Sequence, residues 1–340
     1  MVTLGKTGIV SGKNAFGALP IQRVSAEYAG MLMRKAYDNG WTYFDTARGY
    51  SDSEEKIGLA MSGIRDKIVI ATKTPAWDED GFWRDLETSL RKLKTDYIDI
   101  YQFHNPAFVP RPGGDDGLYD AALKAKQQGK IRFIGITNHR LPVAFEAVES
   151  GLYDTLQFPF SYLSGEREIE LVQLCAERNV GFICMKALSG GLITNSAAAY
   201  AWLAQYANAL PIWGIQRESE LDEFLAYTHN PPELTPELQT IIDKDRAELA
   251  GEFCRGCGYC QPGCVAQISI SNAARMIQLI RRSPSEGWLT PQSQIMMRKV
   301  RDCVNCGACK KACPYGLDTP ALLRKNLADY EAIISGTVKL

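Results

Sequence analysis

Residues 97 to 104 read YIDIYQFH, a run of β-branched and aromatic residues that ends in a histidine. Such a run predicts a buried strand. Similar runs, alternating with amphipathic helical patterns, are NAFGAL at 14–19, TYFDTA at 42–47, KIVIATK at 67–73, RFIGITN at 132–138, TLQFPF at 155–160, GFICMKAL at 181–188 and PIWGIQ at 211–216. Eight strand–helix repeats predict an α/β protein built on a (β/α)8 barrel rather than on an open sheet.

The composition is that of a globular protein. The chain has 340 residues, 46% hydrophobic content and a formal net charge of −1. Nucleic-acid binding requires a clustered basic excess, which the whole chain does not show, so we expect no nucleic-acid partner. The opening MVTLGKTGIVSGK lacks an apolar stretch of signal-peptide length, and glycine, asparagine and proline interrupt the longest uncharged stretch, 187–216. We therefore expect no membrane span and a cytoplasmic location.

Local signals predict the first elements. The stretch SAEYAGMLMRKAYDNG at 25–40 repeats apolar residues at helical spacing and stops at Gly40. SDSEEKIGLAMSGI at 51–64 opens with serine and glutamate residues typical of a capped helix N-terminus. The turn GKTG at 5–8 predicts a hairpin before the first barrel strand.

The character of the chain changes after His229. The proline-rich NPPELTPELQ at 230–239 is followed by a charged, helix-like segment and then by cysteines. Helical patterns at 271–282 and 291–302 lie on either side of SPSEGW, and a last one runs through PALLRKNLADYEAII at 320–334. We predict a barrel over residues 1–230, a linker and helix over 231–252, and a mainly α-helical, ferredoxin-like domain over 253–340.

Four polar residues stand at or just after the ends of successive predicted strands. They are Asp45, Tyr50, Lys73 and His104. The carboxyl ends of barrel strands converge on one face, where chemistry takes place, so we expect the four side chains to meet. A salt bridge, a core histidine and a surface tyrosine with separate roles form the alternative. Together the four suit carbonyl reduction: Lys73, held by Asp45, lowers the pKa of Tyr50, which donates the proton, while His104 orients the substrate oxygen.

The motifs WTYFDTARGY, SEEKIG, VIATK, IDIYQFH and IRFIGITN resemble the signature blocks of the aldo-keto reductase superfamily. The resemblance spans essentially residues 1 to 228, and its catalytic tetrad falls on the four residues named above. It also implies a nicotinamide site without a Rossmann fingerprint. By the family pattern, the carboxamide contacts are Thr137, Asn138 and Gln157, and the pyrophosphate contacts are Leu188, Ser189, Gly190 and Gly191. Asn138 as a helix cap and Gln157 as a core amide are the alternatives.

The stretch after the last predicted strand departs from the family pattern for NADP. In GIQRESELDEF, Arg217 is the only cation, Glu218 and Glu220 add negative charge, and Phe224 stands where an asparagine for the adenine is expected. A second phosphate would meet a mixed field there. NAD or a weakly held nucleotide is therefore an alternative to NADP.

Eight of the ten cysteines form two copies of one motif, C-x2-C-x2-C-x3-C. This spacing predicts two [4Fe-4S] clusters, and the fourth cysteine of each copy commonly ligates the other cluster. One cluster then takes Cys254, Cys257, Cys260 and Cys313, and the other takes Cys303, Cys306, Cys309 and Cys264. Zinc and disulfides are the rival interpretations. The motifs resemble bacterial dicluster ferredoxin modules, although Val265 replaces the usual proline after Cys264.

The remaining cysteines and the charges of the tail have simpler interpretations. Cys175 and Cys184 lie singly in apolar surroundings and are expected to be inert core thiols. Basic residues in and before the second motif either offset cluster charge or form a docking face for an acidic carrier such as a ferredoxin or flavodoxin. They are Arg298, Lys299, Arg301, Lys310 and Lys311.

Three functions remain open from the sequence. The favoured one is an oxidoreductase acting on a small carbonyl or alcohol, with Tyr50 as proton donor and two clusters relaying electrons from a protein partner. A nicotinamide moves two electrons and a cluster one, so a flavin is a further cofactor candidate. The second is an NAD(P)H-dependent carbonyl reductase with structural or oxygen-sensing clusters. The third is an electron-transfer subunit or redox-responsive regulator.

Overall fold

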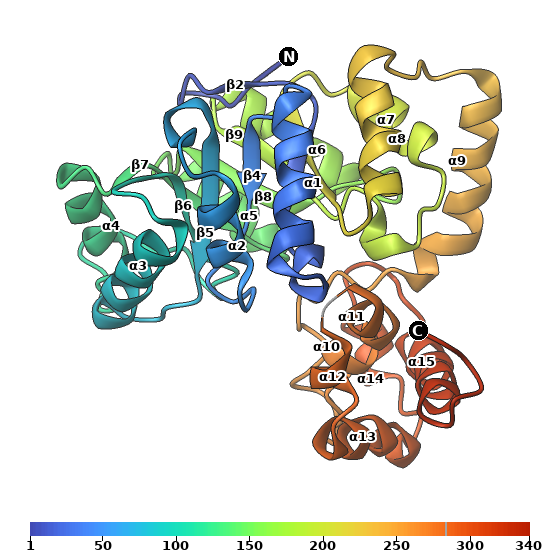
Figure 1. Cartoon of the computed structure of the whole chain (residues 1–340). Coiled ribbons are helices and arrows are strands. Elements are labelled where there is room, and N and C mark those ends of the chain that lie inside the picture. Colours follow the sequence, from blue (N-terminus) through green and yellow to red (C-terminus); the bar gives the residue numbers. More distant parts are fainter. Residues whose placement is uncertain (283) are drawn as a thin grey trace. The chain divides into compact units, whose positions relative to one another are not determined.

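The computed structural model describes residues 1–282 and 284–340 of the chain. Its contacts divide the chain into two compact units (Figure 1). The barrel unit comprises Met1–Ser189 and Ile193–Ile241, and the helical unit comprises Gly190–Leu192 and Ile242–Leu340. The domain boundaries predicted from sequence, at 230 and 252, stay a prediction.

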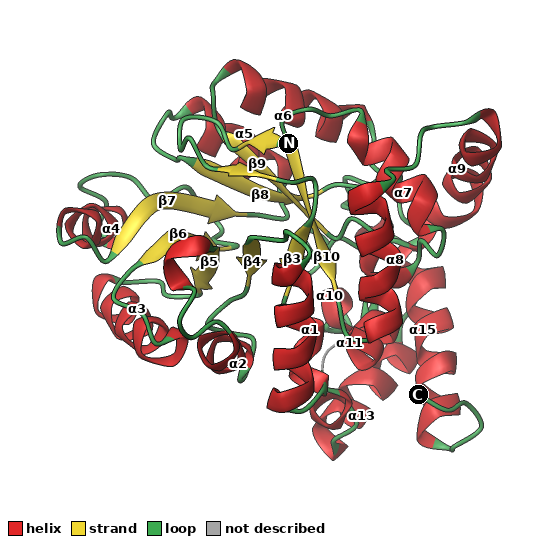
Figure 2. Ribbon diagram, turned by 45° about the horizontal axis from the view of Figure 1, so that its top comes forward, coloured by secondary structure: helices red, strands yellow, loops and turns green. Residues whose placement is uncertain are grey.

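The barrel unit is a closed ring of parallel strands, as the sequence predicts (Figure 2). Neighbouring strands follow chain order, and the ring closes where β10 pairs with β3, with Trp213 opposite Phe16. A Cβ on Gly17 would lie 2.9 Å from the carbonyl oxygen of Trp213, so only glycine fits this closure. The strands are β3 Ala15–Gly17, β4 Tyr43–Asp45, β5 Val69–Thr74, β6 Ile98–His104, β7 Ile131–Thr137, β8 Thr155–Pro159, β9 Gly181–Met185 and β10 Ala209–Gly214.

Helices surround the ring, and an antiparallel hairpin of β1 (Val2–Thr3) and β2 (Val10–Ser11) precedes it as predicted. These helices are α1 Ala26–Asp38, α2 Ser53–Ala60, α3 Glu79–Leu93, α4 Leu118–Gln127, α5 Leu141–Glu149, α6 Glu166–Glu177, α7 Ser196–Ala204 and α8 Glu218–His229. Helix α9, Pro236–Leu249, follows them and contributes residues to both units. Short 3-10 turns are η1 Pro20–Arg23, η2 Arg65–Lys67 and η3 Ser189–Gly191.

The capping prediction for α2 is wrong. Asp52 is the N-cap residue, and its side chain makes no capping hydrogen bond. The Asp52 carboxylate instead pairs with Lys56 at 2.9 Å, while the Ser53 hydroxyl bonds Thr46 and the carbonyl oxygen of Ala18. The Asp52 and Ser53 side chains are therefore engaged in other contacts and do not cap the N-terminus of α2.

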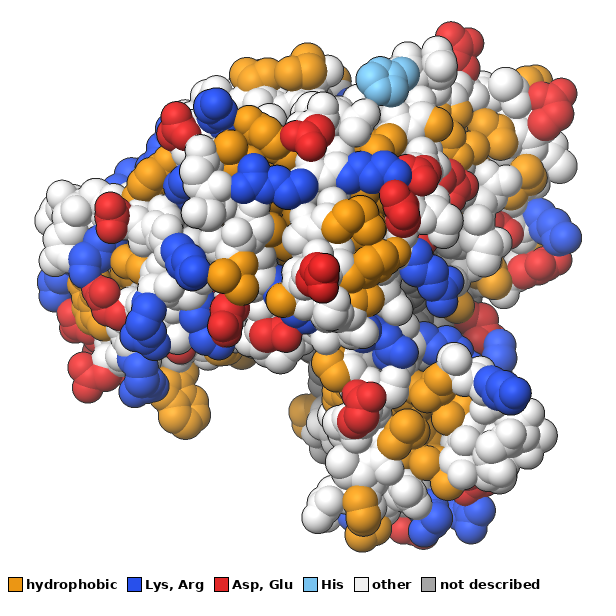
Figure 3. Space-filling view, in the orientation of Figure 1, with side chains coloured by type: hydrophobic (Ala, Val, Ile, Leu, Met, Phe, Trp, Pro, Cys, Tyr) orange, Lys and Arg blue, Asp and Glu red, His pale blue; other side chains and the backbone are white. Residues whose placement is uncertain are grey.

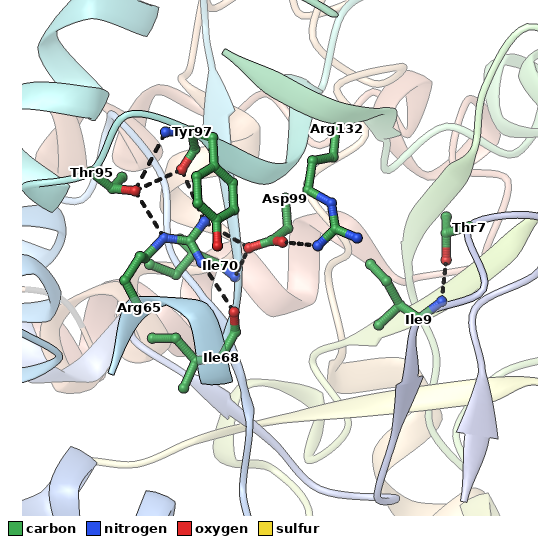
Figure 4. A network of polar contacts seen from close by, with 9 residues as sticks. All are labelled: Thr7, Ile9, Arg65, Ile68, Ile70, Thr95, Tyr97, Asp99 and Arg132. Carbon is green, nitrogen blue, oxygen red and sulfur yellow. Dashed lines mark hydrogen bonds and ion pairs between the residues drawn. The ribbon is translucent and has the colours of Figure 1, made fainter. Parts of the chain in front are cut away.

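A buried carboxylate joins three strands near their amino ends (Figure 4). Asp99, on β6, accepts hydrogen bonds from Arg65 at 2.7 Å, from the backbone NH of Ile70 at 2.9 Å and from Arg132 at 2.6 Å. Arg65 also lies over the ring of Tyr97, at 4.0 Å from its centroid. This end of a barrel serves stability, and the opposite end is left for chemistry.

The helical unit contains no strand among its described residues, in agreement with the sequence prediction. The predicted helix over 271–282 is broken into α10 and α11, and the separator SPSEGW contains a short helix of its own, α12. The buried side chains of α15 pack with those of α10 and α11 in one apolar core. The elements are η4 Ala250–Glu252, α10 Ile270–Ala273, α11 Met276–Arg282, α12 Ser285–Trp288, α13 Pro291–Arg298, η5 Lys299–Asp302, α14 Ala308–Lys311 and α15 Thr319–Ile334.

The surface carries charges of both signs. Basic and acidic side chains are interspersed over the visible face of the barrel unit (Figure 3). None of the helices in the described part of the chain combines the length and apolar character needed to cross a bilayer.

Candidate functional site

The strand ends bring the predicted tetrad together on one face of the barrel. Asp45 is the last residue of β4, Lys73 lies near the end of β5, and His104 is the last residue of β6. Tyr50 follows β4 in a loop that is tied to β5, because the backbone NH of Arg48 donates to the carbonyl oxygen of Lys73 at 2.9 Å. Because β4, β5 and β6 are neighbours in the ring, residues at their carboxyl ends lie close together although they are far apart in the sequence.

Asp45 and Lys73 form a buried ion pair. Lys73 Nζ lies 2.6 Å and 2.8 Å from the two Asp45 carboxylate oxygens, and it also donates to the carbonyl oxygen of Thr46. Burial raises the pKa of Asp45 and lowers the pKa of Lys73, while the attraction between the two charges acts in the opposite direction on each pKa. Removal of one partner would leave the other charge buried without compensation.

The rings of Tyr50 and His104 meet edge to face. Their centroids are 5.9 Å apart and their planes are inclined by 82°. Lys73 Nζ lies 5.2 Å from the centroid of the Tyr50 ring. A phenol, an imidazole and an ammonium ion are therefore grouped beside the ion pair, which is the arrangement expected from the sequence.

The expected lowering of the Tyr50 pKa is not found. Burial is the larger cause and the charge of Asp45 the smaller cause that raise the pKa of Tyr50 above its ordinary value. The Lys73 ammonium donates to Asp45 and to the carbonyl oxygen of Thr46, so burial and the charge of Asp45 dominate at the phenol. Tyr50 therefore holds its proton at neutral pH.

His104 is neutral in this environment. Burial, followed by the positive charge of Lys73, lowers the pKa of His104 to about 3. A neutral imidazole offers a hydrogen bond to a carbonyl oxygen without carrying charge, which suits an orienting role better than acid catalysis.

An amide chain that sequence reasoning missed crosses the barrel interior. Gln102 donates to Gln157 at 2.9 Å, and Gln157 donates to Asp45 at 3.4 Å. The Gln102 Oε1 atom is buried and has no hydrogen-bond partner in the structure. Gly135 makes room for this chain, because a Cβ there would lie 2.8 Å from Gln102 Cγ. The signal in the sequence was the position of Gln102 two residues before His104, on the same face of the strand.

A second missed contact holds the loop that carries Tyr50. Glu54, on α2, accepts hydrogen bonds from Thr72 of β5 and Ser89 of α3, each at 2.7 Å, and forms an ion pair with Arg48. Glu54 is 1% exposed. The loop between Asp45 and Tyr50 is thereby anchored to three elements of the barrel unit.

The side chains predicted to hold a nicotinamide carboxamide are engaged with the protein. Asn138 Oδ1 accepts from the backbone NH groups of His139 and Arg140, and its Nδ2 donates to the carbonyl oxygen of Pro106. Thr137 Oγ1 accepts from the backbone NH of Asn105, and Gln157 belongs to the amide chain described above. Binding of a carboxamide would have to exchange these hydrogen bonds.

The predicted pyrophosphate loop follows β9. Ser189 and Gly190 have positive φ values of 49° and 71°, and that of Gly191 is 99°. The Ser189 hydroxyl lies 2.8 Å from that of Ser161. Leu188 is partly exposed and precedes this turn. A turn with positive φ therefore follows β9 at the position where the family resemblance implies the pyrophosphate contacts.

The N-terminus of α8 is occupied by the protein's own groups. The Glu220 carboxylate accepts from the backbone NH groups of Gln216 at 2.8 Å and Arg217 at 3.1 Å, and Tyr28 accepts from that of Glu218. The Arg217 side chain is exposed. Phe224 stacks on Trp213 with centroids 4.2 Å apart, so this position belongs to the core. A 2′-phosphate would have to compete with Glu220 for these donors.

The eight motif cysteines of the helical unit line two cavities. Cys254, Cys257 and Cys260 line the first cavity together with Cys313. Cys303, Cys306 and Cys309 line the second cavity together with Cys264. Each cavity thus receives three thiols from one motif and the fourth from the other. Ligation of a cluster by these thiols stays a prediction.

The cysteine thiols are arranged around cavities and not around a single-ion position. In the described part of the chain, no three histidine, cysteine or acidic side chains come together closely enough to hold a single metal ion. A four-iron cluster instead takes one thiolate at each iron, so four separated thiols around a cavity fit it. Cys175 and Cys184 are fully buried in the barrel unit, where burial raises the pKa of both thiols, as expected for inert core residues.

Comparison with protein-family models identifies the family of the barrel. The model of the aldo/keto reductase family matches residues 8–198, more than half of the chain. The chain belongs to the aldo/keto reductase family. A second model, that of a 4Fe-4S dicluster domain, matches residues 253–318, which include both cysteine motifs. This oxidoreductase barrel is therefore joined to a 4Fe-4S dicluster domain in one chain.

Several curated relatives resemble the barrel of this aldo/keto reductase. Aldo-keto reductase YhdN of Bacillus subtilis is 34% identical over 48% of this chain and 52% of its own length. L-galactose dehydrogenase of Arabidopsis thaliana is 29% identical over 56% of this chain and 66% of its own length. NADH-specific methylglyoxal reductase of Escherichia coli is 28% identical over 55% of this chain and 64% of its own length. The chain thus spans about half to two thirds of these three relatives.

Solved structures agree with the fold. The aldo-keto reductase from Klebsiella pneumoniae, solved with NADPH, has a TM-score of 0.61 at 21% identity and covers 72% of this chain and 93% of its own. The aldo-keto reductase from Bacillus halodurans has a TM-score of 0.63 at 21% identity and covers 71% and 94%. At this identity the likeness shows the barrel fold alone.

Proposed function

We propose that this aldo/keto reductase reduces the carbonyl group of a small molecule, or oxidises the corresponding alcohol, and that its dicluster domain exchanges electrons with a protein partner. The observation that carries the first part is the group of Tyr50, His104 and the buried Asp45–Lys73 pair, with the Tyr50 and His104 rings 5.9 Å apart. Proton donor, oxygen-orienting group and fixed charge stand together.

Each residue has one task in this reaction. A reduced nicotinamide, when bound, supplies a hydride to the carbonyl carbon. Neutral His104 donates a hydrogen bond to the carbonyl oxygen and fixes its position. Tyr50 gives its proton to that oxygen as negative charge develops, and the raised pKa keeps the phenol protonated until then. The Lys73 ammonium, held by Asp45, stabilises the phenolate that remains.

The nucleotide that we propose is NAD rather than NADP. The donors at the start of α8 are taken by Glu220 and Tyr28, and Glu218 and Asp222 pair with Lys35 at 2.7 Å and 2.5 Å. A 2′-phosphate would gain little there and would meet the charge of Glu220. The hydroxyl of an unphosphorylated ribose would meet no such repulsion.

The two cavities of the helical unit fit two [4Fe-4S] clusters, which supply single electrons. The second cavity is the proposed entry point, because Cys306 is exposed and two apolar residues at its lining, Val265 and Val304, are 74% and 67% exposed. An exposed ligand beside exposed apolar side chains favours exchange with a one-electron carrier protein over a purely structural role. A junction between one- and two-electron chemistry is required, which a flavin or a radical-stabilising substrate supplies.

The proposal is tested on the full chain purified without oxygen. We expect iron and sulfide for two clusters, two interacting [4Fe-4S] signals by EPR after reduction, and turnover of a carbonyl substrate. Tyr50→Phe should lower kcat by roughly 100-fold or more while leaving the EPR signals intact, because it removes only the proton donor. Cys306→Ser should abolish turnover driven by a reduced ferredoxin and should spare turnover driven by NADH.

The outcomes separate the alternatives. Absence of both cluster signals would contradict the electron-exchange part. Full activity of Tyr50→Phe would contradict the catalytic part and leave an electron-transfer subunit. Turnover by NADH alone, with no acceptance of electrons from any protein carrier, would leave a reductase with structural clusters.

A further inference from the structure

The two cysteine cavities differ in the other residues that line them. The remaining lining of the second cavity consists of glycine, alanine, valine, isoleucine, leucine and proline residues. The lining residues of the first cavity also include Arg255 and polar residues, among them Ser271, Tyr315 and Thr319. Apart from its thiols, the second cavity is therefore lined by apolar residues alone, whereas the lining residues of the first cavity include an arginine.

Arg255 is placed inside the first motif and is held in the interior. It is 5% exposed, and its guanidinium lies 4.1 Å from the centroid of the Tyr315 ring and 5.1 Å from that of Phe253. Its Nη1 donates to the carbonyl oxygen of Phe253 at 3.3 Å. The positive charge of Arg255 is therefore held next to the cysteines of the first motif and away from bulk water, in surroundings where a charge is weakly screened.

A second arginine approaches the same motif from the helices. Arg275 lies between α10 and α11, and its Nε donates to the carbonyl oxygen of Ser271 at 2.9 Å. A Cβ on Gly256, between Cys254 and Cys257, would lie 2.9 Å from Arg275 Cζ. The guanidinium therefore packs directly on the loop that carries these two cysteines.

We propose that Arg255 and Arg275 selectively raise the reduction potential of the cluster held in the first cavity. This inference rests on the proposed function, in which each cavity holds one [4Fe-4S] cluster. Reduction adds one electron to a cluster that already carries the negative charge of four thiolates, and no bond is formed or broken. Fixed positive charges nearby lower the energy of the added electron, more so in a low-dielectric interior than in water.

Basic residues near the second motif lack this effect because they are exposed. Lys310 forms an ion pair with Asp318 at 2.8 Å, and its side chain is 55% exposed. Water and dissolved ions screen such a charge, and the partner carboxylate compensates it. The arginines therefore favour residence of the electron at the first cavity relative to a chain without them.

The test is a potentiometric titration of the full chain with dithionite, followed by EPR. We compare the wild type with Arg255→Gln and Arg275→Gln, and use Lys310→Gln as the matched control for loss of one positive charge. Each arginine variant is expected to shift one of the two midpoint potentials to a more negative value and to leave the other in place. The double variant is expected to shift it further, and Arg255→Lys to restore most of it.

The inference would be overturned if neither arginine variant changed a midpoint potential. It would also be overturned if Lys310→Gln changed the potentials by as much as the arginine variants do. Equal shifts of both potentials would overturn its selectivity. Iron and sulfide content shows whether a variant still binds its clusters. If Arg255→Gln loses a cluster, Arg275→Gln decides, since Arg275 lies outside the motif. Absence of clusters from the wild type would instead contradict the proposed function.

Discussion

At the scale of single residues, the charge state of His104 has a measurable consequence. Its pKa in the folded protein is about 3, because burial and Lys73 disfavour the imidazolium, whereas an unfolded histidine has a pKa of about 6.5. Between pH 3 and 6.5 the unfolded state binds more protons than the folded state. Lowering the pH therefore favours the unfolded state. We expect the free energy of unfolding to fall as the pH drops from about 6.5 toward 3, by an amount that His104→Gln removes.

Denaturant unfolding of both proteins across this range measures the effect. His229→Gln, at the exposed end of α8, is the matched control for loss of a histidine. If wild type and His104→Gln lost stability in parallel, the neutral imidazole would be refuted. Because His104 does not titrate between pH 5 and 8, the pH profile of kcat/KM over this range should have the same shape in the wild type and in His104→Gln.

Sequence reasoning predicted the grouping of the tetrad but not its electrostatics. Asp45, Lys73 and His104 end neighbouring strands, so topology alone brings them together. The pKa of Tyr50 depends on where the Lys73 protons point, and three acceptor oxygens of Asp45 and Thr46 decide that. Gln102 was missed for a similar reason, because its partner Gln157 lies on a strand that is distant in sequence.

At the scale of elements, the strands were predictable and several helix ends were not. Strands buried on both faces give continuous apolar runs that a sequence displays directly. The break between α10 and α11 and the extra helix α12 leave no such signal, because they depend on packing in the apolar core of the helical unit. Likewise, the capping motif of α2 failed because Ser53 bonds the barrel instead.

Helix α8 gives the next prediction, which concerns nucleotide preference. Glu220 caps its N-terminus and places a carboxylate beside Arg217, where the sequence predicts the 2′-phosphate contact. Glu220→Ala should raise the ratio of kcat/KM for NADPH to that for NADH by roughly fivefold, the factor that corresponds to about 1 kcal/mol at a helix N-terminus. Glu237→Ala, in the first turn of α9, is the control. An unchanged ratio would show that Glu220 does not select the nucleotide.

At the scale of the whole molecule, two independent sequence signals predicted two structural units. Hydrophobic periodicity predicted the barrel, and cysteine spacing predicted the cluster domain, because ligand geometry fixes that spacing. The sequence did not reveal which charged side chains lie against the first motif. Arg275 lies outside the first motif in the sequence and contacts it only in the folded chain, so its proposed role depends on three-dimensional packing.

Electron entry from a protein partner is a property of the whole chain and gives the final prediction. The motif that contributes exposed Cys306 also contains exposed Lys311, and Lys299 precedes it. Positive charge near an exposed cluster ligand steers an acidic carrier toward it. Lys311→Glu should slow cluster reduction by a reduced ferredoxin roughly tenfold at low salt, measured by stopped flow, and Lys244→Glu, exposed on α9, should not. At about 1 M salt, where the Debye length is about 3 Å, the two variants should converge. A tenfold difference that persisted at high salt would instead mean that Lys311 maintains the cavity itself, and equal rates at low salt would place the docking face elsewhere.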